Sequence, residues 1–313
     1  MRDDTPSRTA AWVAAARQLG RLLPASVRLV DDPFGAAFTS ARLCALIEDA
    51  VADDEPDPSR QLATALRRIK HPLVAMPGLR QWILYMQVRT RVIDDALDAF
   101  VARGGRQVVL LGAGYDCRAL RMPALADARV FEVDHPATQR HKRAVLDELA
   151  QPSPSHYVTW DFEQRPVEDL PDALAEAGHD RAAPTFTIWE GVTMYLSEST
   201  IDASLRAIVE WSAPDSELAM TYFAKARLER PSLATRAVRA VVSTFGEPWR
   251  FGWKPDELPA YLRERGLELV RDVSLAGAAR ELLPGELAAH VSDDDRRVAF
   301  SAVVPEAIAV ART

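Results

Sequence analysis

The sequence predicts an α/β protein in which a mostly parallel sheet follows a helical N-terminal region. From residue 107 onward, short apolar runs alternate with amphipathic stretches, as in βαβ units with right-handed crossovers. A glycine turn, Gly112-Ala113-Gly114, directly follows the first apolar run. Before residue 104 the periodicity is helical. The 313 residues, 48% of them hydrophobic, are sufficient for a large buried core.

The periodicity also gives the expected elements in order. Helices are expected at 9–23, 35–51, 59–70, 79–102, 136–150, 166–178, 198–211 and 256–265. A further basic stretch at 234–243 also has helical spacing. Strands are expected at 107–111, 129–133, 156–159, 184–189, 217–222, 267–273 and 297–304. We therefore expect a helical cap or lid region at 1–103 and a ligand-binding core at 104–313, with a lid insertion at about 223–255.

Composition narrows the class of protein. The net charge of −7 argues against a dedicated nucleic-acid binder, which is usually basic. Two cysteines are too few for a disulfide scaffold, so we expect a cytoplasmic protein. The chain has no apolar run long enough for a membrane span, and its charged start is unlike a secretory signal. The histidines are scattered and show no metal-ligand spacing, so no metal site is expected.

The first two predicted strands indicate a nucleoside site. The run 107–111 is apolar enough to be buried on both faces, and glycines at 112 and 114 let the backbone approach a ligand. The second strand carries Glu132 and runs into Asp134. A carboxylate at that strand end is where ribose hydroxyls bind. The alternative is a tight strand–helix turn without a ligand.

The residues after the turn favour S-adenosylmethionine over a dinucleotide. The dinucleotide fingerprint needs a third small residue where this chain has Cys117 between Asp116 and Arg118. An acid in the turn would repel a diphosphate, whereas S-adenosylmethionine has no phosphate and carries a sulfonium and an ammonium. A nicotinamide-dependent oxidoreductase is therefore disfavoured.

Arg89 interrupts the apolar stripe of the helix expected at 79–102. A guanidinium facing the core needs an anionic partner, because an unpaired buried charge is costly. One interpretation is an internal salt bridge. The other is a clamp on the carboxylate of the methionine moiety, which suits the planar fork of arginine.

Two later strand ends add polar groups to the same edge of the sheet. Asp161 and Phe162 follow the third strand, where a carboxylate and a ring could bind adenine, although Asp161 could instead cap a helix. Glu190 follows the fourth strand and precedes Gly191. A charged residue at that position is expected to face the ligand crevice.

The methyl acceptor is expected to meet aromatic residues. Tyr195 is a candidate for orienting the acceptor, with a packed core tyrosine as the alternative. Trp249, Phe251 and Trp253 lie in an irregular segment rich in glycine and proline, typical of a substrate wall or lid. The alternative is a loop held by its own aromatic cluster. No sequence-local His/Asp pair suggests a general base, which favours carboxyl acceptors because these are already ionised.

Several ordered motifs resemble the leucine carboxyl methyltransferase family, and most closely its bacterial branch of polyketide-tailoring O-methyltransferases. They are GAGYDCRALRM, VFEVDHP, WDF and EGVTMYL, with DDPF, VRTRVIDDAL and FGEPWRFGW. The resemblance covers almost the whole chain. It implies a class I methyltransferase fold, with a Rossmann-like seven-stranded sheet whose last strand is antiparallel. Cys117 departs from the threonine of many relatives.

The resemblance also implies a role for each motif residue. Arg89 would bind the methionine carboxylate and Glu190 the methionine amino group of S-adenosylmethionine. The remaining cofactor residues would be Gly112 and Gly114 for the methionine backbone, Asp134 with Glu132 for ribose, and Asp161 and Phe162 for adenine.

Together these inferences predict a cytoplasmic S-adenosylmethionine-dependent O-methyltransferase. Its acceptor would be a small-molecule carboxylate or phenol of secondary metabolism, with no nucleic-acid or membrane partner, in a monomer or homodimer. One alternative is carboxyl methylation of a protein C-terminus, for which an open groove would argue. Another is a scaffold that binds the cofactor without turnover.

Overall fold

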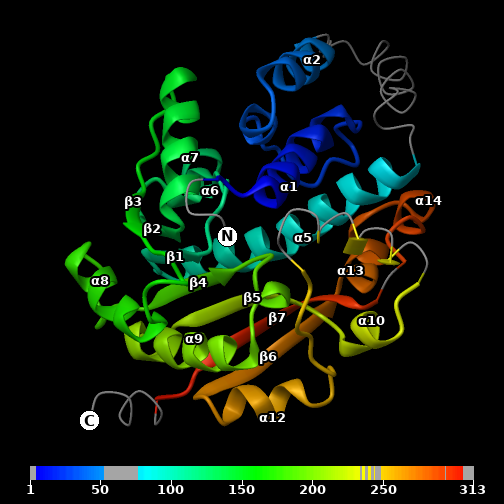
Figure 1. The fold of residues 1–313 in the computed structure, drawn as a ribbon. Helices are drawn as coiled ribbons and strands as arrows, with labels where there is room; N and C mark the ends of the chain where they lie inside the picture. The colour runs from blue at the N-terminus through cyan, green and yellow to red at the C-terminus, as the bar shows by residue number, and fades with distance from the viewer. Residues whose placement is uncertain are drawn as a thin grey trace.

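The structure is a computed structural model that describes residues 5–52, 77–232, 235–236, 239–240, 243, 248–292 and 294–305. Its centre is a seven-stranded sheet with the order β3-β2-β1-β4-β5-β7-β6 (Figure 1). The strands are β1 (Gln107–Leu111), β2 (Arg129–Asp134), β3 (His156–Thr159), β4 (Thr185–Trp189), β5 (Glu217–Phe223), β6 (Leu267–Ser274) and β7 (Arg296–Val303). Neighbouring strands are parallel except where β7 pairs with β5 and β6. The predicted class I methyltransferase topology is confirmed, and every expected strand is present to within one residue at either end.

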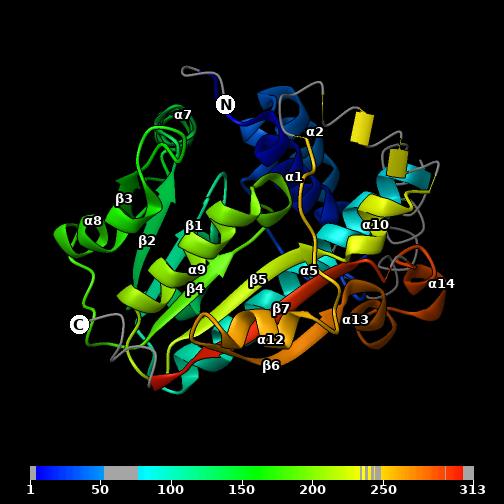
Figure 2. The same ribbon diagram turned by 60° about the horizontal axis from the view of Figure 1, so that its bottom comes forward.

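The two faces of the sheet are buried by different helices. In β1, Val108 and Leu110 belong to the core on one face, and Val109 and Leu111 belong to the core on the other, as the pleat requires. The first core is closed by α5 (Pro77–Ala102) and α13 (Leu275–Leu282). The second is closed by α8 (Leu170–Glu176), α9 (Glu198–Trp211) and α12 (Leu258–Arg263), as the turned view shows (Figure 2).

The N-terminal helices pack beside the ends of the central strands. α1 (Arg8–Leu19) begins at Ser7, whose hydroxyl accepts a hydrogen bond from the Ala10 amide at 3.1 Å as an N-cap. α1 contacts α5 and the short 3-10 helix η2 (Gly35–Phe38), and α2 (Ala41–Ala52) packs on η2. The helix expected at 35–51 is therefore two helices. They part at Thr39, whose hydroxyl donates to the Ala36 carbonyl at 2.7 Å and so satisfies the end of the first one.

The other expected helices differ from the structure mainly at their ends. The stretch 136–150 is α7 (Pro136–Glu148), and 166–178 forms the 3-10 turn η4 (Val167–Asp169) followed by α8. The sequence analysis did not predict α6 (Arg118–Arg121), α10 (Lys225–Glu229), α13 and α14 (Gly285–Ala288). The stretch 59–70 lies outside the described residues, as does half of 234–243. In the described part of the chain, no helix has the length and apolar character that crossing a membrane requires.

Candidate active site

The turn after β1 is shaped by two glycines in the left-handed region. Gly112 has φ +72° and Gly114 has φ +52°. The amide of Gly112 donates to the Val133 carbonyl at 2.9 Å, which joins the turn to β2. A Cβ on Gly112 would lie 2.6 Å from Cγ2 of Val192, so a side chain there is excluded by sterics as well as by φ. The turn thus exposes its backbone at the carboxyl edge of the sheet.

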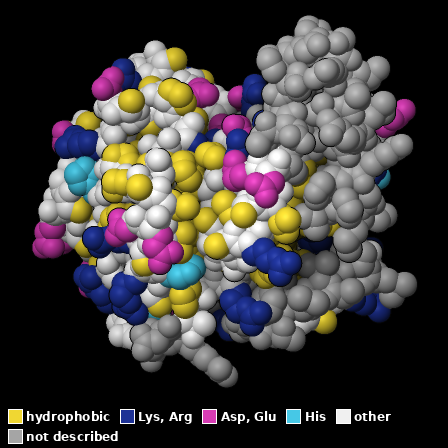
Figure 3. Space-filling view, turned by 90° about the horizontal axis from the view of Figure 1, so that it is seen from above, with side chains coloured by type: hydrophobic (Ala, Val, Ile, Leu, Met, Phe, Trp, Pro, Cys, Tyr) yellow, Lys and Arg dark blue, Asp and Glu magenta, His cyan; other side chains and the backbone are white. Residues whose placement is uncertain are grey.

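A cavity of about 1700 Å³ occupies this edge. Ligand pockets usually measure about 300–1,000 Å³, so this one has room for two ligands side by side. Its walls come from α1 and α5 and from the ends of the central strands. Most of the predicted site residues line it, namely Arg89, Gly112, Gly114, Asp134, Asp161, Phe162, Glu190, Tyr195 and Trp249. Seen from above, the described part of the surface has hydrophobic side chains towards its middle and charged ones mostly around them (Figure 3).

Asp134 presents a carboxylate to the cavity at the end of β2. It accepts hydrogen bonds from the amide of Gly114 and from that of His135, the latter at 2.6 Å. Burial outweighs these bonds and raises the pKa of Asp134 to about 6. A half-buried carboxylate of this kind gains from a ligand that donates hydrogen bonds to it, as a pair of ribose hydroxyls does.

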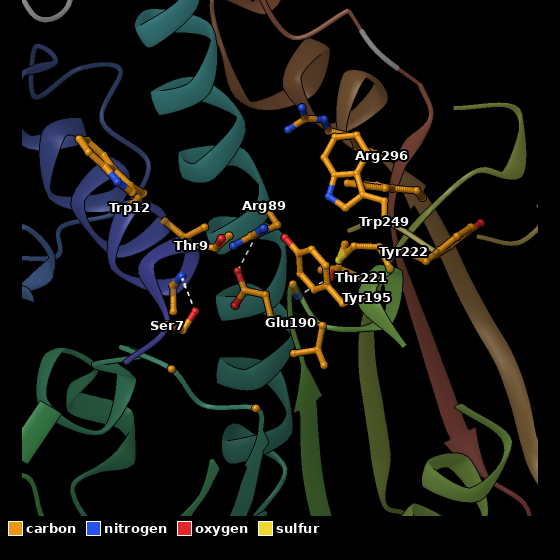
Figure 4. Close-up of a pocket in the computed structure, with 18 of the residues that line it drawn as sticks. Ser7, Thr9, Trp12, Arg89, Glu190, Tyr195, Thr221, Tyr222, Trp249 and Arg296 are labelled. Carbon is orange, nitrogen blue, oxygen red and sulfur yellow. Dashed lines mark hydrogen bonds and ion pairs between the residues drawn. The ribbon is translucent and has the colours of Figure 1, made fainter. Parts of the chain in front are cut away.

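Arg89 and Glu190 form an ion pair in the middle of the cavity. Nε of Arg89 lies 2.6 Å from Oε1 of Glu190, and Figure 4 shows the ring of Tyr195 extending towards this pair. Burial lowers the pKa of Arg89 more than Glu190 raises it. Burial would raise the pKa of Glu190, but Arg89, Arg118 and Arg17 hold it well below its usual range. Both charges therefore persist at neutral pH, and both interpretations of Arg89 fit: it makes an internal salt bridge and it lines the cavity.

A network of buried charges supports this pair from below. Arg118, 1% exposed, binds Oε2 of Glu190 at 2.8 Å and Oδ1 of Asp94 at 2.7 Å, and it also pairs with Asp116. Asp116 also accepts from the Arg118 amide at 2.8 Å. Because Arg118 neutralises Asp116, the acid in the turn would not by itself repel a phosphate. That step of the sequence argument was wrong.

Arg17 joins the network from helix α1. Its Nε lies 2.9 Å from Oδ2 of Asp32, and Nη2 donates to the Tyr115 carbonyl at 2.6 Å. Arg17 thus ties α1 both to the turn after β1 and to the segment that carries Asp32. With this pair the network is balanced, since four guanidiniums meet four carboxylates: Arg17, Arg89, Arg118 and Arg121 with Asp32, Asp94, Asp116 and Glu190.

Asp161 and Phe162 line the far end of the cavity after β3. Oδ1 of Asp161 accepts from the Glu163 amide at 2.9 Å within a turn, and the next helix, η4, has Pro166 at its N-cap, so the expected alternative of a helix cap at Asp161 was wrong. The other, Oδ2, lies 3.4 Å from Nε2 of His135. The carboxylate is held by both contacts at the cavity wall.

Three residues expected at the site do not line the cavity. Glu132 is 1% exposed, and its oxygens bind Nζ of Lys142 at 2.6 Å and Oγ of Ser155 at 2.8 Å. Phe251 and Trp253 belong to the hydrophobic core beneath the sheet, where Trp253 is 4% exposed. Their alternative, an aromatic cluster that holds its own loop, fits this placement: the ring centroids of Phe251 and Trp253 lie 4.8 Å apart.

The sequence analysis missed residues whose partners are distant in the chain. Besides Arg17 and Arg118, these are Tyr85, Tyr222, Arg227 and Arg296, all of which contribute to the cavity except the deeply buried Arg118. The position of Tyr85, four residues before Arg89 on the predicted helix, was the available signal for that residue. Within the described ranges, no group of His, Cys, Asp and Glu could hold a metal ion.

Comparison with known proteins agrees with this geometry. The family described as leucine carboxyl methyltransferase matches residues 10–209. A Streptomyces coelicolor protein is 35% identical over 77% of this chain and 76% of its own length, and a Streptomyces avermitilis protein is 32% identical over 84% and 88%. Both proteins are named as S-adenosyl-L-methionine-dependent methyltransferases, an activity assigned to them by inference. A crystal structure of a DUF574 family protein from Streptomyces avermitilis shares the fold, with a TM-score of 0.55 at 16% identity over 91% of this chain and 99% of that one.

Proposed function

The chain belongs to the leucine carboxyl methyltransferase family and is an S-adenosyl-L-methionine-dependent methyltransferase, and from this premise we propose that it is an O-methyltransferase of secondary metabolism. We propose that its acceptor is a small-molecule carboxylate or phenol. The observation that carries the proposal is that one cavity of about 1700 Å³ combines the charged strand ends with an aromatic wall.

The donor set of the cavity fits the cofactor. We propose that Arg89 binds the methionine carboxylate and that Glu190 binds the methionine ammonium. Each side chain of the ion pair would then exchange its present partner for the opposite charge of the zwitterionic ligand. Asp134 accepts the ribose hydroxyls, and Asp161 with Phe162 holds the adenine. The buried network is balanced in charge, and the carboxylates of Asp134 and Asp161 line the same cavity outside it, which suits a cofactor with a positive sulfonium.

The bound cofactor supplies a methyl group on a positively charged sulfur, and transfer requires an oxygen nucleophile in line with that bond. The residues of this chain contribute alignment and exclusion of water. Gly112 and Gly114 admit the cofactor backbone, while Tyr195 and Trp249 orient the acceptor beside it. A carboxylate acceptor is already ionised at neutral pH and needs no general base.

A small acceptor is favoured over a protein C-terminus by the walls of the cavity. Ser7, Thr9 and Trp12 of the N-terminal region line one side, and Tyr195, Tyr222 and Trp249 line the other (Figure 4). Tyr85 also lines the cavity. We propose that the segment at about 223–255 acts as a lid, since its described residues Arg227 and Trp249 also line the cavity. A folded protein would reach such a site only through an extended tail.

Calorimetric titration with S-adenosylhomocysteine, with NADH as the control, tests the cofactor assignment. We expect micromolar binding of S-adenosylhomocysteine and none of NADH. A folded protein that binds neither would contradict the methyltransferase proposal. Mass-spectrometric detection of methyl transfer to a panel of carboxylic acids and phenols then tests the acceptor class.

A further inference from the structure

The cavity contains a second cationic group away from the balanced network. Arg227, 4% exposed on α10, and Arg296, half-buried at the start of β7, both line it. Figure 4 shows Arg296 and Trp249 on the side of Arg89 opposite to Ser7 and Trp12. The antiparallel direction of β7 brings Arg296 to this edge, where its register partner in β5 is Phe223.

Both guanidiniums lie over aromatic rings. Cζ of Arg227 is 5.1 Å from the ring centroid of Phe223 and 5.4 Å from that of Trp249. Cζ of Arg296 is 4.3 Å from the ring centroid of Tyr85. The rings hold the two cations by cation–π attraction and also provide flat apolar surface next to them.

The electrostatics of this patch differ from those of the cofactor network. Burial lowers the pKa of Arg296 to about 10, and burial together with the charge of Arg296 lowers the pKa of Arg227 to about 10. Asp295 and Tyr85 act in the opposite direction on Arg227 without restoring its ordinary value. In contrast, the pKa of Arg118 is raised well above its ordinary value by the acids around it. Both guanidiniums have other contacts in the structure, Asp295 among the groups that act on Arg227, and both stay charged at neutral pH. An added anion would move the pKa of each back towards its ordinary value.

We propose that Arg227 and Arg296 bind a carboxylate of the methyl acceptor, and that the acceptor is a flat, aromatic carboxylate whose ring system lies against Tyr85 and Trp249. This inference rests on the proposed function and narrows its substrate class. Arginine is suited to the role, because its fork binds a carboxylate in two hydrogen bonds while its plane stacks on a ring. Arg227 and Arg296 would thus join Tyr195 and Trp249 in binding the acceptor, although no sequence motif indicated the two arginines.

The test compares 2-naphthoate with 2-naphthamide, which has the same ring system and no charge. Each is titrated calorimetrically into the full-length protein saturated with S-adenosylhomocysteine, and again without it. We expect the carboxylate to bind at least about tenfold more tightly than the amide, since a hydrogen bond to a charged group contributes about 1.5–3 kcal/mol. Arg296→Gln and Arg227→Gln should each remove most of this difference, and Arg296→Lys should keep part of it.

Arg271→Gln is the matched control. Arg271 also lies over a ring, with Cζ 4.4 Å from the centroid of Phe300, but it is exposed and outside the cavity lining. This variant should bind both naphthalene compounds as the wild type does.

Several outcomes would overturn the inference. These are equal affinity of the wild type for 2-naphthoate and 2-naphthamide, no binding of either at millimolar concentration, or an equal loss of both in the Arg296 variants. The affinity for S-adenosylhomocysteine, measured on the same samples, separates this result from the proposed function. If that ligand fails to bind, the methyltransferase proposal falls, whereas the comparison of carboxylate with amide in its absence still decides the role of the two arginines.

Discussion

Replacing Arg89 by glutamine tests the centre of the site. The guanidinium lies 2.6 Å from Glu190 with its side chain 11% exposed, and we propose that the methionine carboxylate takes the place of Glu190 on it. A hydrogen bond to a charged group contributes about 1.5–3 kcal/mol, and 1.4 kcal/mol corresponds to a factor of ten. Since the ligand must displace an existing ion pair, the lower part of this range applies. We expect S-adenosylhomocysteine to bind Arg89→Gln about tenfold to fortyfold more weakly.

The assay uses two ligands that differ only where Arg89 acts. S-adenosylhomocysteine carries the aminocarboxylate, and 5′-methylthioadenosine lacks it but keeps the ribose and adenine. Calorimetry should therefore find Arg89→Gln impaired for the first ligand and normal for the second. Arg91→Gln is the control on the same helix, because Arg91 is 43% exposed and pairs with Asp95 at the surface.

Two results would refute this reasoning. Unchanged binding of S-adenosylhomocysteine would make Arg89 a purely internal salt-bridge residue. An equal loss of both ligands would indicate that the substitution disturbs the fold of the cavity, which the melting temperature of the apo variant would reveal independently.

Three further predictions concern single positions. We propose that Asp134 binds ribose in its ionised form. Because burial raises the pKa of Asp134 to about 6, affinity for S-adenosylhomocysteine should be full above that pH and fall as the pH drops below it. A raised pKa also means that the stability of the apo protein falls as the pH rises from the ordinary carboxyl range through about 6. Asp134→Asn removes this cost and should raise the apo melting temperature at pH 7. The same variant lacks the carboxylate and should bind S-adenosylhomocysteine weakly at every pH. Trp253→Ala should lower the free energy of unfolding in urea by about 3–5 kcal/mol because the ring is in the core, and a loss of cofactor affinity in the folded variant would contradict this. Gly112→Ala should destabilise the protein more than Gly178→Ala, since both have positive φ but only Gly112 would clash, with Val192; a second Val192→Ala change should recover the difference.

The strands were predictable because their signal is local. Apolar runs such as Val108–Leu111 identify buried parallel strands without knowledge of their neighbours, and the positions of Gly112, Asp134 and Glu190 follow from where those runs end. The helix α13, LAGAAREL, gave no such signal. Its alanines are buried by packing against α5, which is nearly two hundred residues earlier in the chain.

The buried charged residues were less predictable, because the sequence pattern around a charged residue does not show which distant residue it pairs with. Glu132 was expected at the ribose, but Lys142 from the following helix takes up its charge. Arg118 follows the glycine turn and received no role from the sequence, although it connects Asp94, Asp116 and Glu190 from three separate segments. Trp253 lies in a segment whose aromatic residues, glycines and prolines are typical of a substrate wall. Its ring nevertheless packs in the core, which depends on where the segment crosses the sheet.

The antiparallel strand β7 has an implication for how this enzyme could diversify. Reversal of that one strand places its first residue, Arg296, beside the end of β5, so residues from the last third of the chain complete a cavity whose cofactor groups come from earlier segments. The family match ends at residue 209, before Arg227, Trp249 and Arg296. The residues that we propose for the methyl donor thus lie within the family match, whereas part of the proposed acceptor wall lies beyond it. Substitutions in the later stretch can explore new acceptors while the machinery that handles the donor stays intact.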